Sequence, residues 1–167
     1  MIDSSPDAMT AAPASEAFST LRVIIERLTR RRVVAQSSLY TYEAPAGRIY
    51  IPNNDVEGLF HELCHWVSAG PQRRHLENYG LDRDGPGRRG AIQEEICCGW
   101  IEGDTYARAG VHRPKSSVDA KRYQDAPQWH PVALSRWRRY TSWLDRNAVV
   151  EALRLPGGDV GLWKKYA

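Results

Sequence analysis

The sequence His61-Glu62-Leu63-Cys64-His65 places two histidines four residues apart in a stretch with helical periodicity. With about 3.6 residues per turn, positions i and i+4 share one face of a helix, so the two imidazoles can hold one metal ion. Glu62 lies on another face but can lean toward the metal, where it would serve as a general base. The alternative is a pair of ordinary histidines on an amphipathic helix.

The helix that carries this motif is marked at both ends. Residues 53–55, Asn-Asn-Asp, supply N-cap side chains, and Glu57 follows Asn54 at the spacing of a capping box. Gly70-Pro71 predicts the C-terminal end of the helix. A stripe of apolar residues predicts that the helix is buried in the core: Val56, Leu59, Phe60, Leu63 and Val67.

The rest of the chain predicts a mostly helical α+β fold. Three further stretches have helical periodicity: 15–29, 91–109 and 131–153. Two stretches before the motif are rich in strand-forming residues: 33–43 and 48–51. Short strands directly before such a helix are usual in zincin-like folds, so by analogy we expect one zincin-like, metal-binding catalytic domain over residues 15–167. Residues 1–14, rich in Ser, Pro, Asp and Ala, are expected to form a disordered arm.

Composition argues against a membrane protein and against a nucleic-acid-binding protein. The 167 residues, of which 42% are hydrophobic and 26% charged, suit one globular domain. No apolar run reaches the length of a membrane span, and a net charge of +3 is too small to favour direct nucleic-acid binding. Three cysteines in predicted helices, Cys64, Cys97 and Cys98, favour reduced thiols and a cytoplasmic location.

Two histidines do not complete a metal site, so a third protein ligand is needed. Glu94 and Glu95 lie on the next predicted helix, and Glu95 shares a face with Ile92 and Gly99, where a neighbouring helix can approach closely. We therefore expect Glu95 to be the third ligand, with Glu94 as the alternative. Carboxylates near a helix start are also common without a metal, because the helix dipole favours them there. Two histidines and one glutamate suit a single divalent ion, either zinc or iron(II).

A longer pattern extends over residues 48–80. It consists of the strand-like 48–51, the motif extended to H-E-x-x-H-W by Trp66, Ala69-Gly70, the pair Arg73-Arg74 and the aromatic–glycine pair Tyr79-Gly80. In this order and spacing, these features resemble the elongation factor P hydroxylase family. The resemblance implies a metal-dependent enzyme that hydroxylates a modified lysine on elongation factor P, so a protein is the expected partner.

The resemblance also implies roles for individual residues. His61 and His65 would be metal ligands, Glu62 would be the acidic residue of the motif, and Glu95 would complete the site.

The residues beyond the motif are expected to contact the substrate. Arg73, Arg74 and Tyr79 would position the protein substrate. They lie in residues 69–90, which predict a long irregular segment, either a binding loop or a solvated excursion.

Two other functions remain open at the level of sequence. One is a zinc-dependent peptidase in which Glu62 activates water as a general base. The other is a non-catalytic binding module whose surface would include the arginine-rich runs at 30–32 and 136–139. The identity of the metal separates these functions better than the ligand set does, because the same residues suit iron and zinc.

Overall fold

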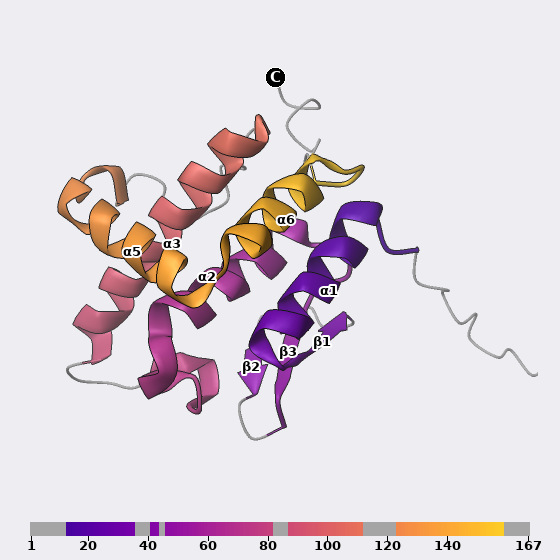
Figure 1. Ribbon diagram of the computed structural model, residues 1–167. Coiled ribbons are helices and arrows are strands. Elements are labelled where there is room, and N and C mark those ends of the chain that lie inside the picture. Colours follow the sequence, from indigo (N-terminus) through magenta and orange to yellow (C-terminus); the bar gives the residue numbers. More distant parts are fainter. Residues whose placement is uncertain (1–12, 36–40, 44–45, 82–86, 112–122, 159–167) are drawn as a thin grey trace, which may run out of the picture.

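The computed structural model describes residues 13–35, 41–43, 46–81, 87–111 and 123–158 (Figure 1). Helices dominate this part of the chain: α1 Glu16–Thr29, α2 Val56–Arg73, η1 Glu77–Gly80, α3 Gly87–Ala109, η2 Pro127–Trp129, α5 His130–Tyr140 and α6 Trp143–Arg154. The strands are β1 Arg32–Ala35, β2 Thr41–Glu43 and β3 Arg48–Ile51. The predicted α+β domain with a short sheet before the motif helix is confirmed. The expected arm, apart from residues 13 and 14, lies outside the described residues.

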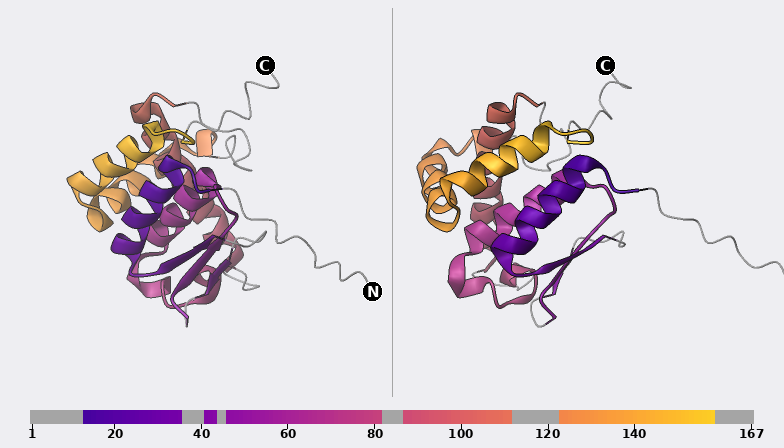
Figure 2. Two further views of the ribbon diagram at one scale, coloured as in Figure 1. Left: turned by 90° about the vertical axis from the view of Figure 1, so that its right-hand side faces the viewer. Right: turned by 45° about the vertical axis from the view of Figure 1, so that its right-hand side comes forward.

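The sheet has the strand order β1-β3-β2 and lies beside α1 at one side of the helices (Figure 2). β1 runs parallel to β3, with Val33 opposite Ile49, and β2 runs antiparallel to β3. Val33, Ile49 and Ile51 are buried, because alternate residues of a strand point to the same face. The sheet therefore contributes one apolar face to the core, and β3 leads directly into α2.

Helix α2 runs through the middle of the molecule, against α1, α3 and α5 (Figure 1). Its predicted apolar stripe is buried, and Phe60 makes edge-to-face contacts with Tyr106 of α3 at 5.8 Å and with Trp137 of α5 at 6.2 Å. Aromatic pairs in this geometry stabilise the core beyond the area that they bury. The motif is thus held on a helix that is fixed from several sides.

The two ends of α2 differ in detail from the expectation. Asp55 is the N-cap and accepts a hydrogen bond from the Gly58 amide at 2.8 Å, whereas the expected capping box of Asn54 and Glu57 is not formed. Asn54 instead adopts a left-handed φ of 63° and accepts a hydrogen bond from the Ser15 amide. At the other end Gly70 breaks the helix with φ 63° and ψ 178°, and one more helical turn follows it.

The expectation of a single helix over 131–153 is wrong, because the helix is interrupted between α5 and α6. Thr141 is extended, with φ −133° and ψ 142°, and Ser142 begins α6 with a capping box that it forms with Asp145. This box satisfies the first backbone amides of a new helix, which the apolar periodicity alone did not reveal. Leu144, which follows this break, is 71% exposed.

One further helix boundary differs from the expectation. Helix α3 begins at Gly87 rather than at residue 91, so the irregular segment before it is shorter than expected and includes η1.

Within the described ranges, no helix is both long enough and apolar enough to cross a membrane. The thiols of Cys64, Cys97 and Cys98 are buried in the core.

Candidate metal centre

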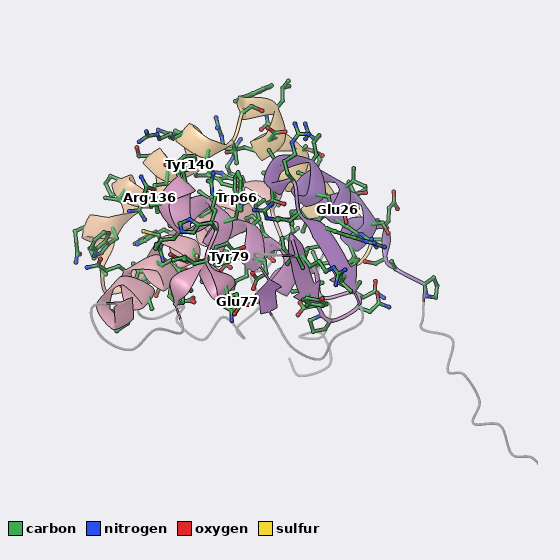
Figure 3. All side chains as sticks on the ribbon, turned by 90° about the horizontal axis from the view of Figure 1, so that it is seen from below. Glu26, Trp66, Glu77, Tyr79, Arg136 and Tyr140 are labelled. Carbon is green, nitrogen blue, oxygen red and sulfur yellow. The ribbon has the colours of Figure 1, made fainter. Side chains whose placement is uncertain are left out.

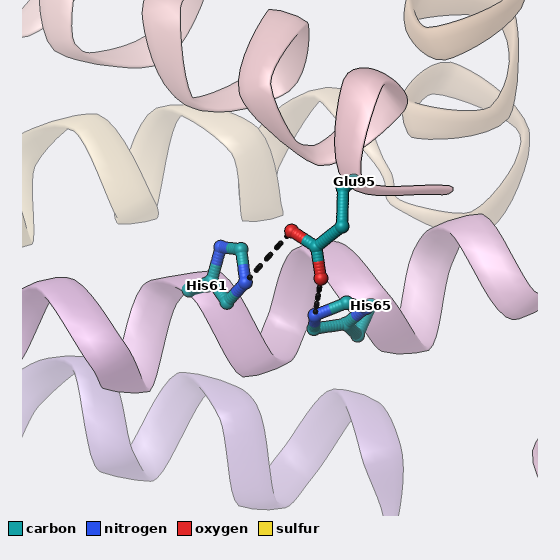
Figure 4. Close-up of side chains that lie close together, drawn as sticks. All are labelled: His61, His65 and Glu95. Atoms are coloured by element: carbon teal, nitrogen blue, oxygen red, sulfur yellow. Dashed lines mark ion pairs between the residues drawn. The ribbon is translucent and has the colours of Figure 1, made fainter. Parts of the chain in front are cut away.

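Both motif histidines of helix α2 face α3, and Glu95 of α3 points toward them (Figure 4). The distance from His61 Nε2 to Glu95 Oε2 is 3.4 Å, and that from His65 Nε2 to Glu95 Oε1 is 3.1 Å. The two rings are nearly perpendicular, with centroids 4.5 Å apart. One ligand atom from each residue lies within 4.8 Å of the others, so the three side chains can hold one ion between them.

A buried carboxylate contacts the other nitrogen of each imidazole. His61 Nδ1 lies 2.5 Å from Glu102 Oε1, and His65 Nδ1 lies 2.8 Å from Glu94 Oε1. Both glutamates come from α3 and are 1% exposed. Such bonds fix the orientation and tautomer of a histidine and make its free nitrogen a better metal donor. Both Nε2 atoms are thereby directed to the side where Glu95 lies.

The phase of α3 explains this arrangement. Glu95 and Glu102 are seven residues apart, which is about two helical turns, so they lie on one face of α3. Glu94 is rotated by about 100° from Glu95 and reaches His65 from the opposite edge of the ring. Sequence reasoning missed Glu102, although its spacing from Glu95 was the signal that could have revealed it.

The close approach expected at Gly99 is made by the helical residue Tyr123 and not by the motif helix. Gly99 does not admit the motif helix: a Cβ atom there would lie 2.6 Å from Cδ1 of Tyr123, whose ring fills this space. Ile92, expected on the same packed face, is 43% exposed. Helices α2 and α3 instead meet through the His–Glu contacts and through buried residues on the adjoining face.

The donor set fits a divalent ion by its spacing and by its chemistry. Bonds of about 2.1 Å place neighbouring ligand atoms roughly 3.4 Å apart in a tetrahedral site and roughly 3.0 Å apart in an octahedral site. His61 Nε2 lies 3.4 Å from one Glu95 oxygen and His65 Nε2 lies 3.1 Å from the other, and both distances are in this range. The side chains of His61 and Glu95 are 29% and 33% exposed, so the centre is open to solvent on their side. A catalytic metal needs such an open position.

The charges of the metal-free centre follow from the same contacts. Burial lowers the pKa of His61, but the hydrogen bonds and charges of Glu102 and Glu95 raise it more, to about 11. Burial raises the pKa of Glu95, yet the hydrogen bonds from His61 and His65 outweigh it and hold that pKa well below its usual range. A proton on His61 therefore supplies the positive charge that a metal ion would supply between these side chains.

Glu62 lies next to the centre without taking part in these pairs. Its side chain is buried, and this burial raises its pKa, although the nearby His65 and His61 act to lower it. Within the described part of the chain, no side chain donates a hydrogen bond to its carboxylate. Its carboxylate is thus available for proton transfer, as the motif requires of a general base.

Tyr79 and Arg73 make contacts within the fold. The Tyr79 ring stacks on the His65 ring at 5.8 Å, its hydroxyl donates to the Glu62 carbonyl, and it is only 1% exposed. Arg73 pairs with Glu94 and donates to the Tyr79 carbonyl. These contacts hold His65 and Glu94 in place. The expected role of Tyr79 and Arg73 in substrate binding stays a prediction.

Arg74 is enclosed by two aromatic rings. Its guanidinium lies 3.4 Å from the centre of the Trp66 ring and 4.5 Å from that of Tyr140, which Figure 3 shows near one another. Its Nε donates to the Trp66 carbonyl at 2.8 Å. This contact fixes the chain after the Gly70 break, so substrate binding by Arg74 also stays a prediction.

The centre as a whole joins two oriented imidazoles, one partly exposed carboxylate and one buried carboxylate that can accept a proton. This combination can hold a divalent ion and carry out acid–base chemistry beside it. The chain was compared with models of protein families, with curated proteins and with solved structures, and none of them matches it.

Proposed function

We propose that this protein is a metal-dependent enzyme whose divalent ion is held by His61, His65 and Glu95. One observation carries the proposal: both imidazoles are held at Nδ1 by buried carboxylates, and both Nε2 atoms face the same third carboxylate. Burying several carboxylates around two histidines is costly unless a cation compensates them. A metal ion is the cation whose donor preferences fit these atoms.

The favoured reaction is hydroxylation of a modified lysine on a protein, with elongation factor P as the expected partner in the cytoplasm. The H-E-x-x-H-W pattern and its flanking pairs support this reaction through their resemblance to the hydroxylase family. When bound, iron(II) at such a donor set activates dioxygen, whereas zinc polarises a carbonyl group and acidifies a water molecule. A zincin-like fold belongs to the same proposal, supported by the short sheet that precedes α2.

The residues of the chain have separate tasks in this proposal. Glu102 and Glu94 orient the histidines, and the Tyr79 ring covers His65 and keeps water from that side of the centre. Glu62 accepts or returns a proton next to the reacting group. The substrate reaches the centre from the exposed side of Glu95.

A zinc peptidase is the second candidate, because a specific observation favours it. Burial of Glu62 raises the pKa of its carboxyl toward the range in which a general base works near neutral pH. In that case Glu62 would take a proton from the attacking water, and substitution by Gln would remove this base without changing the shape of the side chain.

The test begins with metal content. The full-length protein, purified without added metal and protected from oxygen, should contain roughly one divalent ion per chain by elemental analysis. His61→Ala and Glu95→Gln should lose this ion. His75→Ala is the matched control, because His75 is exposed and lies outside the cluster. Retention of the ion by both cluster variants would contradict the proposed site.

Activity then separates the candidates. Supplied with dioxygen and a two-electron reductant, the iron-loaded protein should insert one oxygen atom into the modified lysine of elongation factor P, as seen by mass spectrometry, while the second oxygen atom leaves as water. Zinc, together with peptide cleavage that is lost in Glu62→Gln, would instead establish the peptidase. A folded protein that takes up neither metal would leave only the binding module.

A further inference from the structure

A second group of charged residues lies behind His65, on the side away from Glu95. Here the structure has a cavity of about 190 Å³. Its lining residues are Arg73, Gly80, Gly90, Gln93, Glu94, Trp129 and Arg136. The cavity is separate from the metal centre, because none of the three candidate ligands lines it.

Among the described residues, two arginines but only one carboxylate line this cavity. Arg73 forms an ion pair with Glu94. Arg136 donates to the Ser68 carbonyl at 3.1 Å, and within the described residues it has no carboxylate partner. Both guanidinium groups border the same cavity, and burial and then the charge of Arg136 lower the pKa of Arg73. The described lining residues therefore carry an excess positive charge.

Glu94 cannot neutralise both arginines. One of its oxygens lies against His65 Nδ1 and the other pairs with Arg73, and its side chain is almost fully buried. Gln93 adds an amide group to the lining. A guanidinium offers planar, paired N–H donors that match the two oxygens of a carboxylate or a phosphate group.

We propose that this cavity binds a small oxyanion, a carboxylate or a phosphate group, between Arg136 and Arg73. Its volume is about six times the roughly 30 Å³ that one water molecule occupies in the liquid, which accommodates such a group with some water. This site goes beyond the proposed function, because it needs no metal and uses no metal ligand. The bound group would lie beside Glu94, the carboxylate that orients His65, and would therefore be separated from the metal centre by His65.

The test uses the metal-free, full-length protein, so that the probe cannot bind a metal ion. Inorganic phosphate and acetate are titrated separately by calorimetry, and the tighter of the two identifies the class of oxyanion. Arg136→Gln should weaken the binding about tenfold or more, because it removes charge-assisted hydrogen bonds. Circular dichroism and thermal unfolding show whether this variant is folded.

Arg139→Gln is the matched control. Arg139 lies on the same helix and, like Arg136, lines a different depression of about 520 Å³, but it does not line the proposed site. Its substitution should leave the affinity unchanged. Failure of both probes to bind saturably would overturn the proposal, as would unchanged binding by folded Arg136→Gln. Equal weakening by Arg139→Gln would also overturn it, because the anion would then occupy the larger depression.

Discussion

Glu94 Oε1 lies 2.8 Å from Nδ1 of His65, on the edge of the imidazole that faces away from Glu95. Two neighbouring residues of α3 therefore hold opposite nitrogens of one histidine. This relationship gives the two glutamates different tasks: Glu95 has a partly exposed carboxylate on the side where a metal would bind, whereas Glu94 is buried and orients the ring.

The first prediction separates these two tasks. Glu94→Gln should weaken metal binding about 10- to 100-fold, which is the usual cost of losing a carboxylate that orients a ligand histidine. Glu95→Gln should weaken it more, because two imidazoles alone hold a divalent ion poorly. Competition with a chelator measures both affinities, and Gln93→Ala in the same turn is the control. The reverse order would identify Glu94 as the ligand.

The second prediction concerns the protons released when the metal binds. His61 has a pKa of about 11 in the metal-free protein, so it is protonated near neutral pH, and a metal must displace that proton. Metal affinity should therefore fall by up to about tenfold for each pH unit of acidification. Calorimetry in buffers with different ionisation enthalpies counts the released protons. Glu102→Gln should reduce this number, because it removes a hydrogen bond that raises the pKa of His61.

The same pKa fixes the sign of the effect on stability. The pKa of His61 is higher in the folded protein than its ordinary value of 6.5. Its ion pairs therefore stabilise the metal-free fold fully below about pH 6.5, and this contribution is lost as the pH rises through about 11. Urea denaturation of the metal-free protein should show that the free energy of unfolding declines toward high pH. This decline should be smaller in Glu102→Gln. Equal declines in both proteins would contradict this assignment.

Helical periodicity accounts for what could be predicted of the site. The spacing of His61 and His65 placed both rings on one face, and the phase of the following helix pointed to Glu95. The role of Glu94 did not follow from this phase, because a sequence does not show that a ring can be held from both edges. The ring of Tyr123 packs on Gly99 of α3, a contact between residues distant in the sequence that no local pattern reports.

The helix boundaries show the same limit. Apolar spacing continued from Trp137 through Leu144, so one long helix was expected, yet the local Ser142–Asp145 pattern decided the outcome. Asp55, rather than Asn54, caps α2 because Asn54 is used by the Ser15 amide, a contact between distant parts of the chain. Local capping signals were therefore informative, but the choice between adjacent candidates depended on tertiary contacts.

The fourth prediction tests the break in α2. Gly70 has φ 63° and ψ 178°, a conformation that is essentially restricted to glycine, and an added Cβ would lie 3.0 Å from Gln72 Oε1 and 3.3 Å from the Tyr140 hydroxyl. Gly70→Ala should therefore lower the free energy of unfolding by about 1–3 kcal/mol, measured by urea denaturation. Gly103→Ala is the control, because Gly103 is helical and its added Cβ would meet Tyr123 at ordinary contact distance. That variant should be neutral or more stable, by up to about 1 kcal/mol.

The last prediction concerns the break that separates α5 from α6. The Ser142 hydroxyl accepts a hydrogen bond from the Asp145 amide at 3.0 Å, and the Asp145 carboxylate accepts one from the Ser142 amide at 3.3 Å. Asp145 also pairs with Arg27 of α1 at 2.6 Å, so the cap connects α6 to α1. Ser142→Ala should lower the free energy of unfolding by about 1 kcal/mol, the usual effect of losing an N-cap.

Ser19→Ala is the matched control, because Ser19 is exposed within α1 and caps no helix. Alanine is the better helix former, so this variant should be as stable as the parent protein or slightly more stable. Urea denaturation of the metal-free proteins compares the two variants without a contribution from metal binding. If Ser142→Ala and Ser19→Ala have the same stability, the capping box does not stabilise α6, and the break at Thr141 must be maintained by the packing of α6 on α1 and α3.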